Sequence, residues 1–326
     1  MHVLPRRLLA LVAAAAVTHA AVAAAPVSTP ATYRTVNLMP EFWSFYDKAR
    51  TLPVDAQGAV FARTVVKSHP EVYNHAVIGG DTSKPFEQMV ADRYVKVQSL
   101  IGPRMDLMRE VSARIGQDLP RYEARFRKTF PDLAYKGELY FMYSLGGFDG
   151  ATRKVHDQTA LLFGLDMITW VYGKDADPEP FFDHELFHIY HKQYPDPAPG
   201  YSDKFVTALW GEGLAMHVAQ TMNPQAHGVA IFGLPRNTPE RAQAMVPALA
   251  RDIRGLLDST SPDDYKRFFL GSSEQAETPS RSGYYVGFLV AQKLGQRHSL
   301  QELAHTPVSK LRPEIEAALD ELAQAR

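Results

Sequence analysis

Apolar residues recur at helical spacing from residue 40 to about residue 130, and prolines interrupt this pattern at intervals. An aromatic helix begins at residues 41–46. Apolar faces at helical spacing usually pack into the core, so we interpret this region as scaffold. Further helices are predicted at 56–66, 85–100 and 105–115, with breaks at Pro53, Pro70, Pro103 and Pro120.

The central part of the chain changes to a strand pattern. Residues 138–145 are rich in residues that favour strands, and the glycine-rich segment 146–150 is a strong turn signal. Residues 160–171 predict a second strand, in which Gly164 indicates a bulge or a close approach of another backbone. The free edge of this strand can pair with an extended peptide, or the strand can be internal to the sheet. The sequence leaves both alternatives open.

Helical spacing returns after the strands. A helix is predicted over 180–193, and a proline-rich loop separates it from a second helix over 204–220, capped by Ser202 or Asp203. The segments that follow are also helical. They include 232–254, 265–270, an apolar helix to about residue 294, a capping box at Ser299 and Glu302, and a last helix opened by Pro313.

The N-terminus has the layout of a secretory signal peptide. Arg6 and Arg7 precede a short apolar run over 8–17, and small residues at 21–24 fit a cleavage site. The apolar run is short for a transmembrane helix, although an uncleaved anchor is the alternative. We therefore expect an exported protein, periplasmic in a Gram-negative cell or otherwise secreted, with no stable membrane insertion after cleavage.

Composition narrows the chemistry that the chain can perform. The 326 residues carry a net charge of −1, which gives no indication of a nucleic-acid partner. Cysteine is absent, so a metal ion has to be held by His, Asp or Glu. No sequence feature fixes the oligomeric state.

The motif H-E-x-x-H at residues 184–188 is the strongest chemical signal in the chain. On a helix, His184 and His188 lie one turn apart on the same face and can bind one Zn²⁺. Glu185 then stands beside the metal, where it can act as general base toward a metal-bound water.

Catalytic zinc usually takes three protein ligands, so a third ligand is required. His191 lies on the same face, but about 10 Å along the axis from His184 at a rise of about 1.5 Å per residue, so both cannot reach one ion. Glu212 is the better candidate, because it is the single carboxylate in an otherwise apolar helical stripe. A lone buried carboxylate is unfavourable unless it is paired, protonated or bound to a metal. The alternative is a glutamate at an exposed helix edge.

These motifs resemble those of the gluzincin zinc metallopeptidases, in which a Glu on the helix after H-E-x-x-H is the third ligand. W-G-E-G-L-A at 210–215 carries this likeness, which is greatest for the uncharacterised DUF2268 type of exported zinc-dependent proteases. Met216 stands where thermolysin-type enzymes have an Asp, and the spacing from the second His to the Glu is slightly longer. Details around the metal ligands are therefore not transferred from thermolysin.

A third motif, G-Y-Y-V-G at 283–287, resembles the Y-x-x-G of gluzincin aminopeptidases. The resemblance implies that the Tyr284 hydroxyl donates to the oxyanion of the reaction, with Tyr285 as the fallback. A phenol is a neutral donor at working pH and suits this role. The alternative is an aromatic pair packed at a helix start.

The sequence therefore predicts an α+β protein with a two-lobed, gluzincin-like fold: a small sheet with the H-E-x-x-H helix, and a mainly helical C-terminal lobe. We expect a signal peptide at 1–25, a mostly helical region at 26–135, the sheet and metal-binding helices at 136–222, and the helical lobe at 223–326. Residues 26–326 are expected to form one catalytic unit.

The predicted function is hydrolysis of peptide bonds in a peptide or protein substrate, by a Glu185-activated water on one Zn²⁺. Only the resemblance supplies the word "peptide", because such a site can also cleave other amides or esters. The alternatives are a non-proteolytic metal hydrolase on the same scaffold and a non-catalytic exported helical binding protein. Lone histidines elsewhere are interpreted as structural or solvated: His156, His217, His227, His298 and His305.

Overall fold

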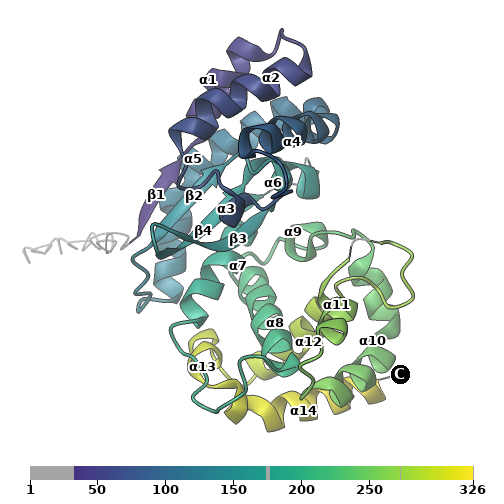
Figure 1. Ribbon diagram of the computed structural model, residues 1–326. Helices are drawn as coiled ribbons and strands as arrows, with labels where there is room; N and C mark the ends of the chain where they lie inside the picture. The colour runs from purple at the N-terminus through teal and green to yellow at the C-terminus, as the bar shows by residue number, and fades with distance from the viewer. Residues whose placement is uncertain (1–32, 174–176, 272, 326) are drawn as a thin grey trace, which may run out of the picture. The chain divides into compact units, whose positions relative to one another are not determined.

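The computed structural model describes residues 33–173, 177–271 and 273–325, which belong to one unit of the chain (Figure 1). The predicted signal peptide, residues 1–25, lies outside the described residues. The α+β prediction is confirmed, because many helices accompany one small sheet. Within the described part, no helix has both the length and the apolar character that crossing a membrane requires.

The sheet of the described region holds four strands in the order β1-β2-β4-β3. β1, β2 and β4 are parallel, whereas β3 is antiparallel to β4 and forms an edge of the sheet. β4 is therefore internal, and the edge strands are β1 and β3, both of which the sequence pattern missed. The strands span Arg34–Asn37 (β1), Glu138–Met142 (β2), Gly150–Val155 (β3) and Gln158–Gly164 (β4).

An aromatic cluster joins the N-terminal helices to the sheet. Phe42 stacks on Tyr143 with ring centroids 4.4 Å apart, and Phe61 meets the same tyrosine edge-on at 5.7 Å. The scaffold role predicted for this region agrees with this burial. The helices are α1 Met39–Ala49, α2 Val54–Phe61 with a π-helical continuation Ala62–Val66, α3 His75–Ile78, α4 Phe86–Ile101 and, after the 3₁₀ turn Gly102–Arg104, α5 Met105–Thr129.

Two predicted helix boundaries at prolines are wrong. α5 continues through Pro120, and the last helix begins at Val308 instead of Pro313. A proline inside a helix costs about 3 kcal/mol. In α5, the buried side chains of Leu119 and Tyr122 lie on either side of the proline and extend one apolar face along the helix. Burial of that face outweighs the local penalty.

The strand predicted over 160–171 is wrong in its second half, where the chain forms helix α6, Leu165–Tyr172. A continuous apolar run fits a buried strand and a buried helix equally well, so periodicity cannot separate them. The change occurs at Gly164, where an added β-carbon would lie 2.0 Å from the carbonyl oxygen of Phe148. The close backbone approach predicted at Gly164 is thereby confirmed.

After α6, all elements of the described residues are helices. Helix α7 lies between the sheet and the other C-terminal helices (Figure 1). The predicted capping box at Ser299 and Glu302 is confirmed. The predicted cap at Ser202 or Asp203 is wrong, because Lys204 is the N-cap of α8 and makes no side-chain cap. The helices are α7 Pro178–His191, α8 Phe205–Met222, α9 Val229–Phe232, α10 Thr238–Leu256, α11 Pro262–Phe269, α12 Ser282–Gly295, α13 Leu300–His305 and α14 Val308–Gln324.

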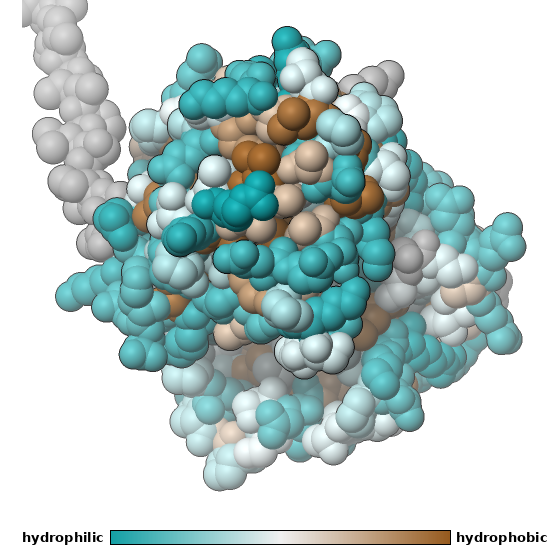
Figure 2. Space-filling model, turned by 45° about the horizontal axis from the view of Figure 1, so that its top comes forward, coloured by the Kyte–Doolittle hydropathy of each residue, from teal (hydrophilic) through white to brown (hydrophobic). Residues whose placement is uncertain are grey.

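Figure 2 turns the end of the molecule that carries α1, α2 and α4 toward the viewer. The surface is mostly hydrophilic, with apolar atoms exposed between the polar side chains. The large apolar residues exposed on these elements and on the loop before α2 are Leu52, Val54, Val95 and Leu100.

Candidate metal centre

Helix α7 presents the first two candidate ligands. The Asp177 side chain accepts a hydrogen bond from the backbone amide of Glu179 at 3.1 Å, which caps the helix, and Pro178 occupies its first turn. Eleven of the fourteen residues of α7 are buried, which fixes the helix between neighbouring elements. His184 and His188 therefore project one turn apart, as the sequence predicts.

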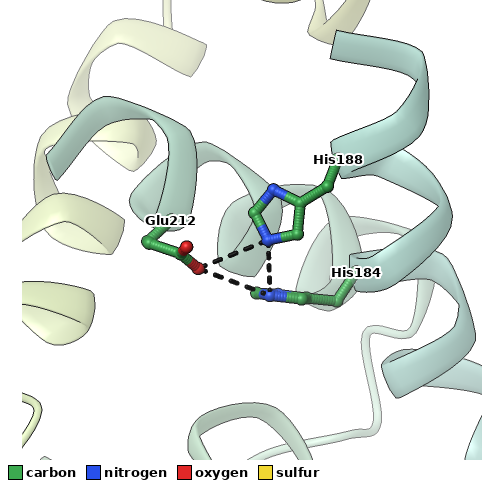
Figure 3. Close-up of side chains that lie close together, drawn as sticks. All are labelled: His184, His188 and Glu212. Carbon is green, nitrogen blue, oxygen red and sulfur yellow. Dashed lines mark hydrogen bonds and ion pairs between the residues drawn. The ribbon is translucent and has the colours of Figure 1, made fainter. Parts of the chain in front are cut away.

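Glu212 on α8 meets the two histidines (Figure 3). Its Oε2 lies 3.6 Å from His184 Nε2 and 3.3 Å from His188 Nε2, and the two Nε2 atoms lie 3.0 Å apart. Among the described residues, these three form the group of His, Asp and Glu side chains close enough to hold one metal ion. Helices α7 and α8 thus bring together the predicted ligands, although His188 and Glu212 are 24 positions apart in the sequence. The group could bind a metal ion.

The separations fit a small four-coordinate cation. Ligand distances of about 2.0–2.2 Å in a tetrahedral arrangement place ligand atoms about 3.3–3.6 Å from one another. The three observed separations lie at or just below this range. Two imidazole nitrogens and one carboxylate oxygen also leave a fourth position free for another ligand.

The electrostatics of the group suit a cation. Burial alone would raise the pKa of the Glu212 carboxyl, but His188 and His184 outweigh it and hold this pKa below its ordinary value. Burial lowers the pKa of His188, but the Glu212 and Glu185 carboxylates together raise this pKa above its ordinary value. Each of these opposed effects shows that the polar atoms face one another inside the protein instead of facing water.

Helix α8 is held in position by a close crossing with α12. A β-carbon added to Gly213 would lie 2.2 Å from the carbonyl carbon of Gly287, and one added to Gly287 would lie 2.5 Å from the backbone oxygen of Leu209. Gly213, the residue after Glu212, therefore permits the close approach of the two helices. Gly211 has no neighbour within 4 Å of such a β-carbon.

Glu185 lies beside the candidate ligands and against Gly150, the first residue of β3. A β-carbon at Gly150 would lie 2.7 Å from Glu185 Cδ and Oε1, so a larger residue there would require the carboxylate to shift. Burial raises the pKa of Glu185, partly offset by His184 and His188. Glu185 and His184 line a cavity of about 50 Å³, with Met216 and Arg281 among the other lining residues.

The two tyrosines of the G-Y-Y-V-G motif point in different directions. The Tyr285 hydroxyl donates to Gln243 on α10 at 2.5 Å, and its ring packs on Phe232. Tyr284 is partly buried, and its ring contacts Phe269 and the Arg281 guanidinium. Burial and then the Glu212 carboxylate raise its pKa. The oxyanion role of either tyrosine stays a prediction.

Sequence reasoning missed two residues near the site. Tyr265 on α11 has its pKa raised by burial and by Glu212, and Arg281 lines the cavity beside Glu185. Both come from segments without a recognisable motif. His191, by contrast, stays outside the ligand group as predicted: its ring stacks on Phe187 with centroids 5.4 Å apart.

A buried polar network holds α7 and α8, the helices that carry the candidate ligands, against α5. The fully buried Asp183 accepts hydrogen bonds from Arg125 on α5 (2.9 Å) and from Asn223, the residue after α8 (2.8 Å). Arg125 also pairs with buried Glu179 at 2.8 Å. One arginine thus ties α5, α7 and the end of α8 together, and no sequence motif had indicated it.

Comparisons with known proteins found no match among family models, curated proteins or solved structures.

Proposed function

We propose that the protein is a zinc-dependent hydrolase, and more specifically a metallopeptidase with the two-lobed architecture of the gluzincins. The observation that carries this proposal is the convergence of His184, His188 and Glu212, because two neutral ligands and one anionic ligand leave Zn²⁺ with net positive charge. Nitrogen and carboxylate ligands at these separations suit zinc, although ligand type alone also admits other divalent ions.

Bound zinc would polarise the scissile carbonyl and lower the pKa of a water molecule at the fourth position. Glu185 would accept the proton of that water and later deliver it to the leaving amine. Its raised pKa suits both steps, since a carboxylate of higher pKa is a stronger base and can be reprotonated more readily. The Tyr284 hydroxyl would donate to the developing oxyanion.

The position of β3 supports a peptide as substrate. β3 is an edge strand, and its first residue, Gly150, lies against Glu185. An extended peptide added along this edge would bring its backbone past the proposed general base. We therefore propose hydrolysis of peptide bonds, with export through the N-terminal signal peptide to the periplasm or the medium.

Two other functions compete with this proposal. A hydrolase acting on other amides or esters would use the same three ligands and the same base. A non-catalytic binding protein would have a structural metal site, but such sites are usually closed by four protein ligands. The group formed by the described residues contains three, which favours the catalytic alternative.

A metal assay combined with a Glu185→Gln variant tests the proposal. Purified wild-type protein should hold about one zinc per chain and cleave a mixture of unstructured peptides, with activity lost to a chelator and restored by zinc. Glu185→Gln should retain zinc and lose cleavage by about 10²–10⁴-fold. The matched control is Glu87→Gln, which changes an exposed carboxylate on α4. Absence of stoichiometric zinc, or full activity in Glu185→Gln, would refute the mechanism.

A further inference from the structure

Arg281 brings a cation into the cavity that contains the proposed general base. It is the N-cap residue of α12, and its side chain lines the cavity together with Glu185, His184, Tyr172 and Asp149. Its backbone lies in the left-handed region, with φ of 61°, a conformation that is unfavourable for any residue with a side chain. The local fold therefore holds Arg281 in an uncommon conformation at the wall of the site.

Contacts on the walls hold the guanidinium in place. Nη1 donates to the carbonyl oxygen of Leu234 at 3.3 Å, and the guanidinium carbon lies 4.4 Å from the ring centre of Tyr284. Gly233 leaves the room that the guanidinium needs, because a β-carbon there would lie 3.1 Å from Nη1. Arg281 also has a hydrogen-bonding interaction with the Tyr284 side chain. These contacts engage only part of a guanidinium that carries five N–H donors.

The charge of Arg281 has no close counterpart in the protein. Within the described residues, no carboxylate forms an ion pair with Arg281 within 4.0 Å, although Asp149 and Glu185 line the same cavity. Three other partly buried arginines have carboxylate partners: Arg125 with Asp183, Arg254 with Glu316, and Arg312 with Asp258. Arg93 and Arg241 instead donate to backbone carbonyls, but neither lines the cavity of the candidate site. A partly buried guanidinium with free donors is suited to an anion that enters from outside.

We propose that Arg281 binds a carboxylate of the substrate. The inference rests on the proposed peptidase function and narrows its substrate class to peptides that present a carboxylate next to the scissile bond. The planar guanidinium can donate two parallel hydrogen bonds to a carboxylate, which would fix the substrate relative to Glu185. That carboxylate belongs either to the C-terminus of a peptide or to an acidic side chain.

Three peptides of equal length separate these sources. Two share one sequence, with a free and an amidated C-terminus, and the third is the amidated peptide with a glutamate substituted beside the cleaved bond. The wild type should cleave one of the two carboxylate peptides about 10–100-fold more efficiently than the plain amide, through a lower KM. Arg281→Gln should abolish this preference, because it should reduce cleavage of the preferred carboxylate peptide at least about tenfold more than cleavage of the plain amide. Arg281→Lys should retain part of the preference, because lysine keeps the positive charge but lacks the two parallel N–H donors of the guanidinium.

Arg236→Gln is the matched control, because Arg236 also donates to a backbone carbonyl, that of Val171 at 3.1 Å, but does not line the cavity. A wild type without preference for either carboxylate peptide would overturn the proposal. An equal loss on all three peptides in Arg281→Gln would also overturn it, since a group acting on the oxyanion would affect every substrate.

A binding measurement keeps this proposal separate from the proposed function. Zinc-free protein is titrated with acetyl-Ala-Phe and acetyl-Ala-Glu-amide, each against its uncharged counterpart, by isothermal calorimetry. Tighter binding of a carboxylate form in the wild type, lost in Arg281→Gln, supports the subsite even if no peptide is cleaved and the peptidase proposal fails. Equal binding of charged and uncharged forms, together with peptide cleavage that shows no carboxylate preference, refutes the subsite and leaves the peptidase proposal standing.

Discussion

Gly213 on α8 and Gly287 on α12 approach so closely that neither position has room for a β-carbon. A β-carbon on Gly213 would overlap the backbone carbonyl of Gly287, at 2.2 Å from its carbon. The obstructing atoms are backbone atoms, which cannot move aside by a change of rotamer. This crossing fixes the turn of α8 that carries Glu212 and the first turn of α12, which carries Tyr284.

Gly213→Ala should therefore destabilise the protein by about 1–3 kcal/mol or more, because the two helices have to separate. It should also weaken metal binding, because Glu212 moves with the backbone of α8. Urea unfolding and a competitive zinc titration measure the two effects.

Gly211→Ala is the matched control on the same helix. An alanine there meets no neighbour within 4 Å, so it should be neutral or stabilise the protein by up to about 1 kcal/mol through helix propensity. Equal stabilities of the two variants would contradict the role of the crossing.

Asp166 carries the second prediction, because it organises the turn that leads to Asp149 and β3. This fully buried carboxylate accepts hydrogen bonds from the amide (2.7 Å) and hydroxyl (2.9 Å) of Ser144 and from the amide of Gly146 (2.7 Å). Asp166→Asn places an amide nitrogen toward one of these donors. We expect it to destabilise the protein by about 1–3 kcal/mol.

The destabilisation should depend on pH with a definite sign. Burial raises the pKa of Asp166 against the hydrogen bonds that lower it, so the folded state retains the proton to higher pH than the unfolded state. The stability that this group contributes is then fully present below its unfolded pKa of about 3.9 and is lost as pH rises through the folded pKa. Urea unfolding at pH 5 and pH 8 should show a smaller gap between wild type and Asp166→Asn at pH 8. A gap that widens with pH would show that the hydrogen bonds outweigh burial.

The ligand set could be predicted from the sequence because each part of it is a local pattern. His184 and His188 follow from helical spacing alone, and Glu212 from one carboxylate in an apolar stripe. The backbone of a helix fixes the direction of each side chain, so predicting the two helices also predicted which residues share a face. What the sequence could not supply was the crossing of α7 and α8, which depends on packing between distant segments.

The cavity beside the ligands could not be predicted, because its walls come from irregular segments. Arg281 precedes a helix in a left-handed conformation, and Gly150 begins an edge strand inside a stretch that reads as a turn. Neither position has a periodic signal. The segment 160–171 failed for another reason: its continuous apolar run is compatible with strand and helix, and the contact of Gly164 with a distant carbonyl decides where one ends and the other begins.

A third prediction ranks the candidate metal ligands. Glu212→Ala should lower zinc affinity by more than about 100-fold, beyond the 10- to 100-fold typical of residues that only support a ligand. His191→Ala should lower it by less than about tenfold, because its ring stacks on Phe187 outside the ligand group. Competition with a chromophoric chelator measures both. A larger loss in His191→Ala would mean that the third ligand is His191 and not Glu212.

The last prediction separates the two tyrosines of the motif, and it rests on the proposed hydrolysis. Tyr284→Phe removes a hydroxyl whose pKa is raised by burial and then by the Glu212 carboxylate. It should lower kcat by about 10²–10³-fold with little change in KM, because the proposed donor acts in the transition state. Tyr285→Phe removes the hydrogen bond to Gln243 and should reduce stability by about 1 kcal/mol while kcat stays unchanged. The reverse pattern would assign the oxyanion donor to Tyr285. Full activity in both variants would exclude both tyrosines as the oxyanion donor. Tyr265, whose pKa Glu212 also raises, would then be the next candidate.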